Sequence, residues 1–290
     1  MLKYVDHKKM GRSQLGWLDS HFHFSFAEYY NPQNIRFGVL RVFNDDIIRA
    51  QTGFGPHPHQ NMEIVTYVVQ GEVSHEDSMG NAHALTRGQV QYMSAGTGIF
   101  HSEYNRQENA DLRLTQIWIL PDNHSYTPNY GDYSFALEDR FNKWLPIVTG
   151  YHNPQNTAPV KIHQDVNMYA AILDANKSID FQVGGGRQAY LVCLEGGADV
   201  GGIHLQERDA LEIIEEDVTV TTSGGCHLLV IEMAYDNEYY KKFNLKKTLQ
   251  HSPLSRSAKK PAHTDYINNS SFLDQYVPIT WVLSEAARRP

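Results

Sequence analysis

The chain has 290 residues and a formal net charge of −8, and 41% of its residues are hydrophobic and 20% charged. These values are typical of a globular protein with enough apolar material to bury a core. No apolar run approaches the roughly 20 residues that a membrane helix needs, and the N-terminal residues lack the apolar region of a secretory signal. We therefore expect a cytoplasmic protein without a membrane contact.

The charge is unevenly distributed along the chain. Residues 237–290 hold nine Lys and Arg against four Asp and Glu, so this tail carries +5 and the rest of the chain −13. Phosphate binding needs clustered cations, so the acidic part predicts no nucleic-acid surface on the main fold. The tail is interpreted as a solvated basic segment.

The pattern along the chain is that of β-strands. Short runs rich in Val, Ile, Tyr and Phe end at Gly, Asn or Asp, and no long amphipathic helix separates them, which predicts an all-β sandwich or barrel. The runs expected to be strands are Ile35–Phe43, Glu63–Val69, Gln89–Met93, Leu112–Ile119, Ala189–Leu194, Leu211–Ile214, Val218–Thr222 and His227–Met233. Short helices are expected only at Phe135–Trp144 and after Asp236.

A weak internal repeat indicates two copies of one β-barrel module. Residues 66–71 and 190–196 each have the pattern of a strand that ends in a tight glycine turn. In both places a return strand, a second turn and a further strand follow at similar distances. We expect an N-terminal barrel over 1–135, a second barrel over 136–236 and a basic, partly mobile tail over 237–290. The Ser/Lys/Pro/Asn-rich stretch 251–271 is the part of the tail expected to be most mobile.

Two short motifs carry the chemistry. His57 and His59 form one pair, and His101 and Glu103 form a second pair about forty residues later. Side chains two residues apart on a strand share a face, so each pair presents two polar groups on one side. Pro58 favours extended geometry before it and removes a ladder hydrogen bond, which predicts an edge strand. Face to face in a barrel, the pairs would supply three imidazoles and a carboxylate.

This donor set suits one divalent transition metal per chain. Imidazole and carboxylate together fit Fe, Mn, Co, Ni, Cu or Zn, whereas Ca and Mg prefer oxygen ligands throughout. Four protein ligands around a six-coordinate ion leave about two positions for a substrate and dioxygen. We favour Fe among these metals.

Other residues compete with this assignment. Glu63 lies an even number of residues after His57 and His59, so on a continuous strand it would face the same side, and it is a rival fourth ligand. The pair His21 and His23 lies in an aromatic run without a carboxylate partner and is interpreted as wall packing. His75 is interpreted as part of a polar turn with local hydrogen bonds, and we prefer this interpretation to a role as a metal ligand. Cys193 and Cys226 lie in apolar strands and are interpreted as packing residues.

The sequence resembles the pirin family of bicupins over residues 1 to about 235. The segments that carry the resemblance are Gly16–Ser20, Phe24–Phe26, Leu40–Val42, Phe54–Gly55, His57–His59, Met62–Ile64, Thr66–Tyr67, His75–Ser78, Met93–Gly98, His101–Asn105 and Gln116–Trp118. The resemblance implies two tandem cupin barrels, with the metal held by the residues at His57, His59, His101 and Glu103. Glu63 then becomes a neighbour that orients a ligand imidazole.

The resemblance also implies an activity. Some pirins are quercetin 2,3-dioxygenases, so we expect a metal-dependent dioxygenase that opens a flavonol, with dioxygen as co-substrate and Glu103 as the catalytic proton acceptor. The alternative is a metal- or redox-sensing pirin that regulates an unknown protein partner without turnover. Rings expected around the mouth of the site are Phe22, Phe24, Phe54, Phe100 and Tyr67.

The second module departs from this pattern. The positions aligned with the ligands carry Gln182, Gly184, Arg187 and Thr222. We therefore expect a second barrel that holds no metal. The tail beyond about residue 236 has no counterpart in the bacterial pirins that the chain resembles.

Overall fold

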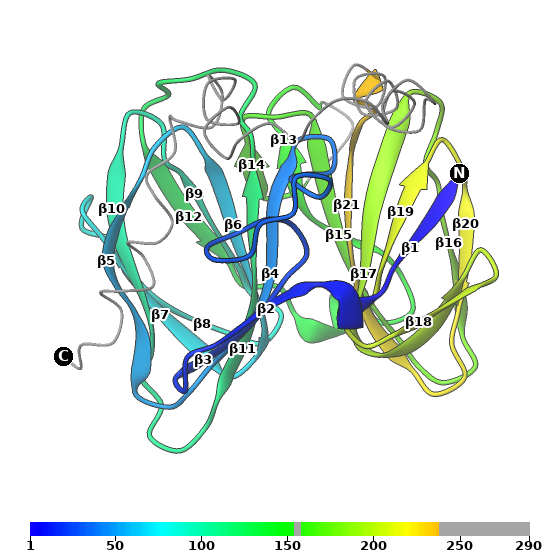
Figure 1. The fold of residues 1–290 in the computed structure, drawn as a ribbon, viewed down its shortest axis with the longest axis horizontal. Coiled ribbons are helices and arrows are strands. Elements are labelled where there is room, and N and C mark those ends of the chain that lie inside the picture. Colours follow the sequence, from blue (N-terminus) through cyan, green and yellow to red (C-terminus); the bar gives the residue numbers. More distant parts are fainter. Residues whose placement is uncertain (154–157, 238–290) are drawn as a thin grey trace, which may run out of the picture.

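A computed structural model of the chain describes residues 1–153 and 158–237. These residues form two β-barrels that lie side by side (Figure 1). The expected tail over 237–290 and the helix expected after Asp236 lie almost wholly outside the described residues. No helix among the described residues has the length and apolar character needed to cross a bilayer.

The first barrel consists of two sheets that pack face to face. A seven-stranded sheet has the order β12-β9-β6-β11-β4-β3-β2, and a four-stranded sheet has the order β5-β10-β7-β8. Their bounds are β2 Gly11–Gln14, β3 Leu18–Phe22, β4 Leu40–Ile48, β5 Thr52–His59, β6 Glu63–Gln70, β7 Glu72–Asp77, β8 Ala82–Thr86, β9 Val90–Ser94, β10 Ile99–Asn105, β11 Leu112–Ile119 and β12 Asn129–Tyr133.

The second barrel is built around one sheet with the order β1-β19-β17-β21-β15-β13-β14, to which β16, β18 and β20 are attached. Its strands are β1 Leu2–Val5, β13 Leu145–Gly150, β14 Val160–Ile162, β15 Val166–Leu173, β16 Ser178–Phe181, β17 Arg187–Val200, β18 Ile203–Gln206, β19 Ala210–Ile214, β20 Val218–Thr221 and β21 Cys226–Ala234. The only helices in the described part are the short 3₁₀ turns η1 His7–Lys9 and η2 Leu137–Arg140.

The all-β prediction is confirmed, with two local differences. The strand expected at Ile35–Phe43 instead runs over Leu40–Ile48. The polar residues 44–46 resemble the end of a strand in the sequence, but β4 continues through them. The first strand, β1, pairs with β19 of the second barrel, although residue 1 was expected to open the first barrel. The predicted division between residues 135 and 136 stays a prediction.

Each barrel has its own apolar interior, and a third core lies between them. Along β6, Ile64 and Val68 face the interior of the first barrel, while Val65 and Tyr67 face the second barrel. Tyr190 on β17 packs into the same shared core. The period of two along a strand explains this division, since alternate side chains face opposite sides of a sheet. The second barrel's interior consists mainly of aliphatic side chains, together with Phe181 and both cysteines.

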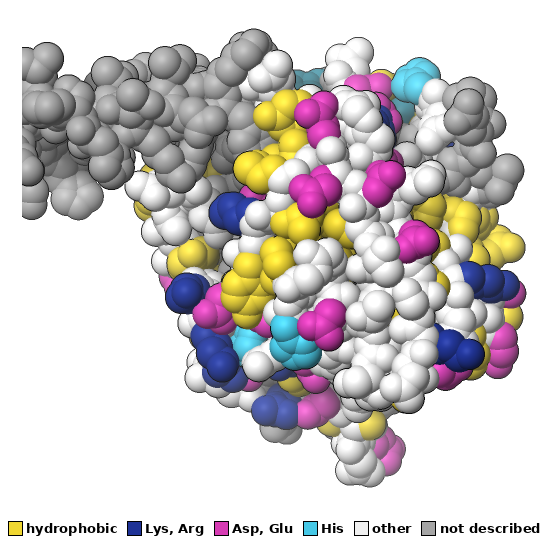
Figure 2. Space-filling view, turned by 90° about the vertical axis from the view of Figure 1, so that its right-hand side faces the viewer, with side chains coloured by type: hydrophobic (Ala, Val, Ile, Leu, Met, Phe, Trp, Pro, Cys, Tyr) yellow, Lys and Arg dark blue, Asp and Glu magenta, His cyan; other side chains and the backbone are white. Residues whose placement is uncertain are grey.

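The surface of the second barrel is mixed in character. Acidic and apolar side chains are interspersed over the face shown in Figure 2, and Lys and Arg lie mainly toward its margins. Among the described residues on that face, the cations therefore form no continuous band of the kind that binds nucleic-acid phosphates.

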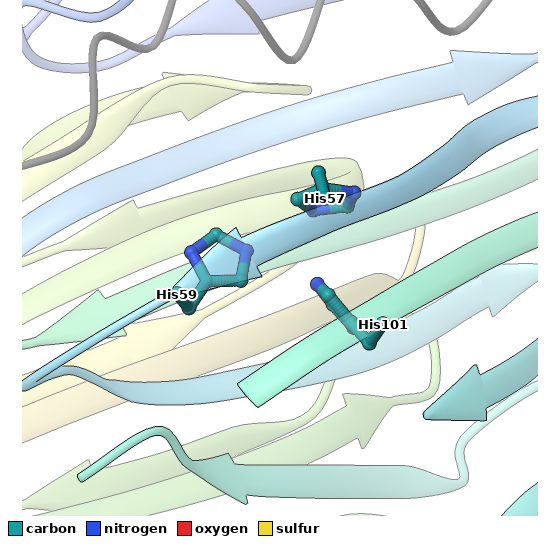
Figure 3. Close-up of side chains that lie close together, drawn as sticks. All are labelled: His57, His59 and His101. Carbon is teal, nitrogen blue, oxygen red and sulfur yellow. The ribbon is translucent and has the colours of Figure 1, made fainter. Parts of the chain in front are cut away.

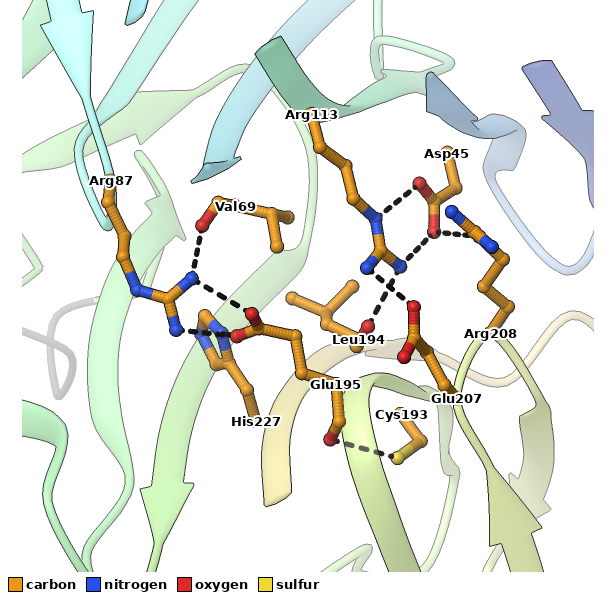
Figure 4. A network of polar contacts seen from close by, with 10 residues as sticks. All are labelled: Asp45, Val69, Arg87, Arg113, Cys193, Leu194, Glu195, Glu207, Arg208 and His227. Carbon is orange, nitrogen blue, oxygen red and sulfur yellow. Dashed lines mark hydrogen bonds and ion pairs between the residues drawn. The ribbon is translucent and has the colours of Figure 1, made fainter. Parts of the chain in front are cut away.

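An ion-pair cluster also joins the barrels, and its pH response is a testable property. Arg87 donates to both oxygens of Glu195 on β17, at 3.0 and 2.5 Å, and His227 on β21 lies 2.8 Å from the same carboxylate (Figure 4). Burial acts to raise the pKa of Glu195, but the hydrogen bonds with His227 and Arg87 outweigh it and lower the pKa to about 2.

We expect this cluster to stabilise the fold above about pH 4.5 and to lose its contribution as the pH falls toward 2, because a lowered carboxyl pKa favours the ionised folded state. The Glu195 side chain is 32% exposed, so solvent screening makes the gain in unfolding free energy smaller than the pKa shift alone would give. Urea unfolding of wild type and Glu195→Gln at pH 6 and pH 3 measures it. The variant should lose less stability between the two pH values, and equal losses would contradict the assignment.

Candidate metal centre

Three imidazoles converge inside the first barrel. The edge strand β5 pairs antiparallel with β10, and His101 lies directly opposite His57. His59 shares the face of His57 because the two are separated by one residue, Pro58, at the sheet edge, as predicted. The ring centroids lie 4.4 Å apart for His57 and His101, 4.8 Å for His57 and His59, and 4.9 Å for His59 and His101 (Figure 3).

The environment of these rings favours the neutral form that binds metals. All three are buried, and burial lowers the pKa of His57 to about 4 and those of His59 and His101 well below the usual value. One nitrogen of each ring lies within 4.8 Å of the others. Neutral imidazoles with convergent nitrogens are suitable ligands for a transition metal.

The hydrogen bonds of the rings test whether a metal fits. The Nδ1 atom of His57 lies 2.8 Å from the Gly55 carbonyl oxygen, which leaves Nε2 for another partner. Both ring nitrogens of His101 are buried and make no hydrogen bond within the chain. A buried polar atom without a partner costs about 1–3 kcal/mol. A metal ion bound by His101 would remove this cost at one nitrogen, so the residues fit the ion.

Glu103 lies on β10 next to this cluster and is held by neutral donors. Its Oε1 accepts hydrogen bonds from Gln91 at 2.6 Å and Thr66 at 3.1 Å, and its Oε2 accepts one from Gln116 at 2.6 Å. Burial raises its pKa to about 7. Its carboxylate lines the same cavity as His57 and His59. Its place as the fourth metal ligand stays a prediction.

His75 was expected in a polar turn, and the structure places it in a strand. It lies on β7 directly opposite Glu103, is 1% exposed, and offers a nitrogen within 4.8 Å of ligand atoms of His101 and Glu103. Its local contact is to Asp77 at 3.4 Å, and Asp77 itself caps the following turn by accepting from Met79 N–H. Which face of β7 lies beside β10 cannot be inferred from the sequence, so the position of this fourth imidazole next to the cluster was not predicted.

Glu63 lies away from the cluster, and its expected role beside a ligand imidazole is wrong. Its oxygens accept hydrogen bonds from Ser94 Oγ at 2.7 Å and from the His163 backbone N–H of the second barrel at 3.1 Å. The expectation that Glu63 shares a face with His57 and His59 failed because a turn separates β5 from β6, and β6 belongs to the other sheet. Glu63 therefore faces the interface between the barrels.

The remaining candidates pack as expected. His23 is fully buried, lies 4.5 Å from the Phe43 ring and contacts the Tyr190 hydroxyl at 2.9 Å, so it joins the two barrels. His21 is also buried in the wall. Cys193 and Cys226 are buried free thiols with pKa values raised by burial, which is typical of packing residues.

A cavity opens beside the imidazoles. The space between its walls is about 430 Å³ when the open mouth is counted, and the part that can hold the centre of a water molecule is about 30 Å³. The residues that line it are Leu18, Ser20, Phe22, Phe26, Asn44, Asp46, Phe54, His57, His59, Glu103, Gln116 and Trp118. Of the rings expected at the mouth, only Phe22 and Phe54 line it. Phe24 and Tyr67 pack between the barrels, and Phe100 is 53% exposed outside the lining.

The second barrel shows no comparable cluster among its described residues. Arg187 pairs with Glu232 and Asp165, and Thr222 donates to the Gly197 carbonyl oxygen. The one further group of possible ligands, formed by Asp6, His7 and Asp209, is held by its own internal hydrogen bonds.

Together, two β-barrels and an imidazole cluster within the first define a bicupin with a candidate metal site. The family described as Pirin matches residues 5–119, and the family described as Quercetinase C-terminal cupin domain matches residues 152–233. The chain belongs to the pirin family.

Individual relatives agree with this assignment. The chain is 38% identical to a quercetin 2,3-dioxygenase of Escherichia coli K12 over 77% of this chain and 94% of that one. It is 39% identical to a pirin-like protein of Caulobacter vibrioides over 78% and 97%. It is similar to the crystal structure of the bacterial pirin YhhW from Escherichia coli in complex with nickel(II), with a TM-score of 0.75, 35% identity, and 81% and 100% coverage.

Proposed function

We propose that the protein is a metal-dependent dioxygenase that opens the ring of a flavonol, as in quercetin 2,3-dioxygenases. The observation that carries the proposal is the cluster of three buried neutral imidazoles beside a cavity walled by aromatic rings. Its membership of the pirin family and its identity to a named quercetin 2,3-dioxygenase support the substrate class.

In this proposal His57, His59, His101 and Glu103 hold one divalent transition metal. Iron is our preferred ion, and Mn, Co, Ni, Cu and Zn are compatible with the same donors. When bound, the metal supplies a Lewis acid that favours the anionic form of a substrate hydroxyl.

The chain's own groups have distinct roles. Glu103 accepts the proton of the substrate's 3-hydroxyl, because its carboxylate lines the cavity beside His57 and His59 at the proposed metal site. Gln91 and Gln116 fix both carboxylate oxygens, so the proton acceptor is held in one orientation. The rings of Phe22 and Trp118 offer flat apolar surfaces to a polyphenol and exclude water.

The direct test is to load the purified protein separately with Fe, Mn, Co, Ni or Cu and follow quercetin absorbance under air. The proposal expects loss of flavonol absorbance with at least one of these metals and release of one carbon monoxide per ring opened. No loss with any of them would favour the alternative, a metal- or redox-sensing pirin that binds a protein partner.

The role of Glu103 gives a second expectation. Glu103→Gln keeps the shape of the side chain but removes the proton acceptor, so kcat should fall by about 10²–10⁴-fold. Steady-state kinetics measure the loss of turnover, and elemental analysis measures separately whether the variant still binds the metal. Glu63→Gln is the matched control, since Glu63 faces Ser94 and the second barrel, and it should retain wild-type turnover. Turnover by Glu103→Gln within about threefold of wild type would exclude the assigned role.

A further inference from the structure

The cavity contains a polar surface that the proposed metal chemistry does not use. Ser20 on β3 and Asn44 and Asp46 on β4 line it, and their exposed fractions are only 1%, 3% and 3%. The Asn44 side-chain oxygen is buried and makes no hydrogen bond within the chain. An apolar substrate would therefore leave polar groups of the cavity unsatisfied.

The strand register places these groups in one strip with the metal-site residues. Ser20 lies opposite Asp46 across β3 and β4, and Asn44 lies opposite Gln116 across β4 and β11. Gln116 in turn donates to Glu103. A polar strip thus crosses one side of the cavity, from Ser20 to the proposed proton acceptor, while aromatic rings line the remaining wall.

The strip can recognise a hydroxyl group. The Asn44 oxygen can accept a hydrogen bond from it, and an unmade bond at this buried atom costs about 1–3 kcal/mol. Ser20 donates to Oδ1 of Asp46 and holds that carboxyl group in place. Burial, followed by the charges of Asp45 and Glu103, raises the pKa of Asp46 to about 7, so near neutral pH this group is present both as a donor and as an acceptor.

We propose that Asn44 and Asp46 form a subsite that binds a second hydroxyl group of the aromatic substrate, in addition to the hydroxyl beside the metal ligands. This inference rests on the proposed function, because it places an aromatic hydroxyl compound in this cavity. It selects polyhydroxylated flavonols such as quercetin over 3-hydroxyflavone, which has no second hydroxyl. Sites built to hydrogen-bond a substrate hydroxyl discriminate strongly against analogues that lack it.

The experiment measures binding without turnover. Nickel-loaded full-length protein is titrated with quercetin or 3-hydroxyflavone in the absence of dioxygen, and tryptophan fluorescence reports the dissociation constants. Wild type should bind quercetin at least about tenfold more tightly. Asn44→Leu should weaken quercetin binding by about tenfold and leave 3-hydroxyflavone within about twofold.

Two further variants separate this effect from a general loss of structure. Asp46→Leu keeps a side chain of similar size but removes both the donor and the acceptor, so it should also weaken quercetin binding selectively. Gln188→Leu is the matched control, because Gln188 is a buried amide without hydrogen-bond partners that lies outside the cavity lining, and it should change neither affinity. Equal losses for both ligands in the two cavity variants, or no preference in wild type, would overturn the subsite.

The outcomes also separate this inference from the proposed activity. If quercetin binds selectively through Asn44 but is not consumed under air with any of the metals, the dioxygenase proposal fails and the subsite stands. If both flavonols are cleaved and bound equally well, the subsite fails and the dioxygenase proposal stands.

Discussion

His101→Ala is expected to reduce metal affinity by on the order of 100-fold or more and to lower flavonol turnover to background. His101 contributes a candidate ligand atom both to the group with His57 and His59 and to the group with His75 and Glu103. Its loss therefore removes a donor from every candidate ligand group of the first barrel within the described residues. Chelator competition and elemental analysis measure the affinity independently of turnover.

The control for His101→Ala lies on the same sheet. His83 on β8 lies directly opposite His75 on β7, but it is half exposed and its Nδ1 atom lies 3.0 Å from Asp132. His83→Ala should retain metal affinity and turnover. His101→Gln keeps most of the buried volume, so a stable fold with lost metal binding would separate ligation from packing. Undiminished metal affinity in both His101 variants would exclude this cluster as the metal site.

The imidazole cluster could be predicted because its signal is local. The separation of two residues fixes the shared face of His57 and His59 on one strand, and the same rule relates His101 to Glu103 on another. Whether the two strands meet is a matter of topology, and the structure places them as neighbours. Three of the four residues form one group, and Glu103 belongs to a second group with His101 and His75.

The sequence reasoning failed where a face depends on a change of sheet or on an unknown strand partner. Glu63 continues the parity of His59 on paper, but the chain turns and enters another sheet between them. His75 shares the interior face of β10 only through its pairing with Glu103. Neither relation has a local signal, because strand pairing is set by contacts distant in the sequence.

The polar run on β4 misled the strand prediction for a related reason. Asn44, Asp45 and Asp46 read as a strand end, yet β4 continues through them to Ile48. Asn44 and Asp46 line the cavity, whereas Asp45 faces the second barrel and pairs with Arg113 on the neighbouring strand β11. The secondary structure that the local sequence favours differs from the observed fold most often at functional sites. This disagreement independently draws attention to the cavity strip.

Arg113→Ala is expected to lower the free energy of unfolding by about 3 kcal/mol, the largest stability effect that we predict. Arg113 donates to both oxygens of Asp45, at 2.8 and 2.6 Å, and reaches Leu194 O and Glu207 of the second barrel, both at 2.8 Å (Figure 4). The Asp45 side chain is 1% exposed, so without Arg113 its charge stays buried with Arg208 as its remaining ion-pair partner among the described residues.

Urea unfolding of wild type and variant measures this loss. Arg49→Ala is the matched control, because Arg49 also pairs with an aspartate, Asp111, but both side chains are more than one-third exposed; it should cost under about 1 kcal/mol. The double variant Arg113→Met with Asp45→Leu should be more stable than Arg113→Ala, since it removes the buried charge together with its partner. A loss in Arg113→Ala no larger than in Arg49→Ala would mean that Arg113 and its buried partner Asp45 do not stabilise the fold.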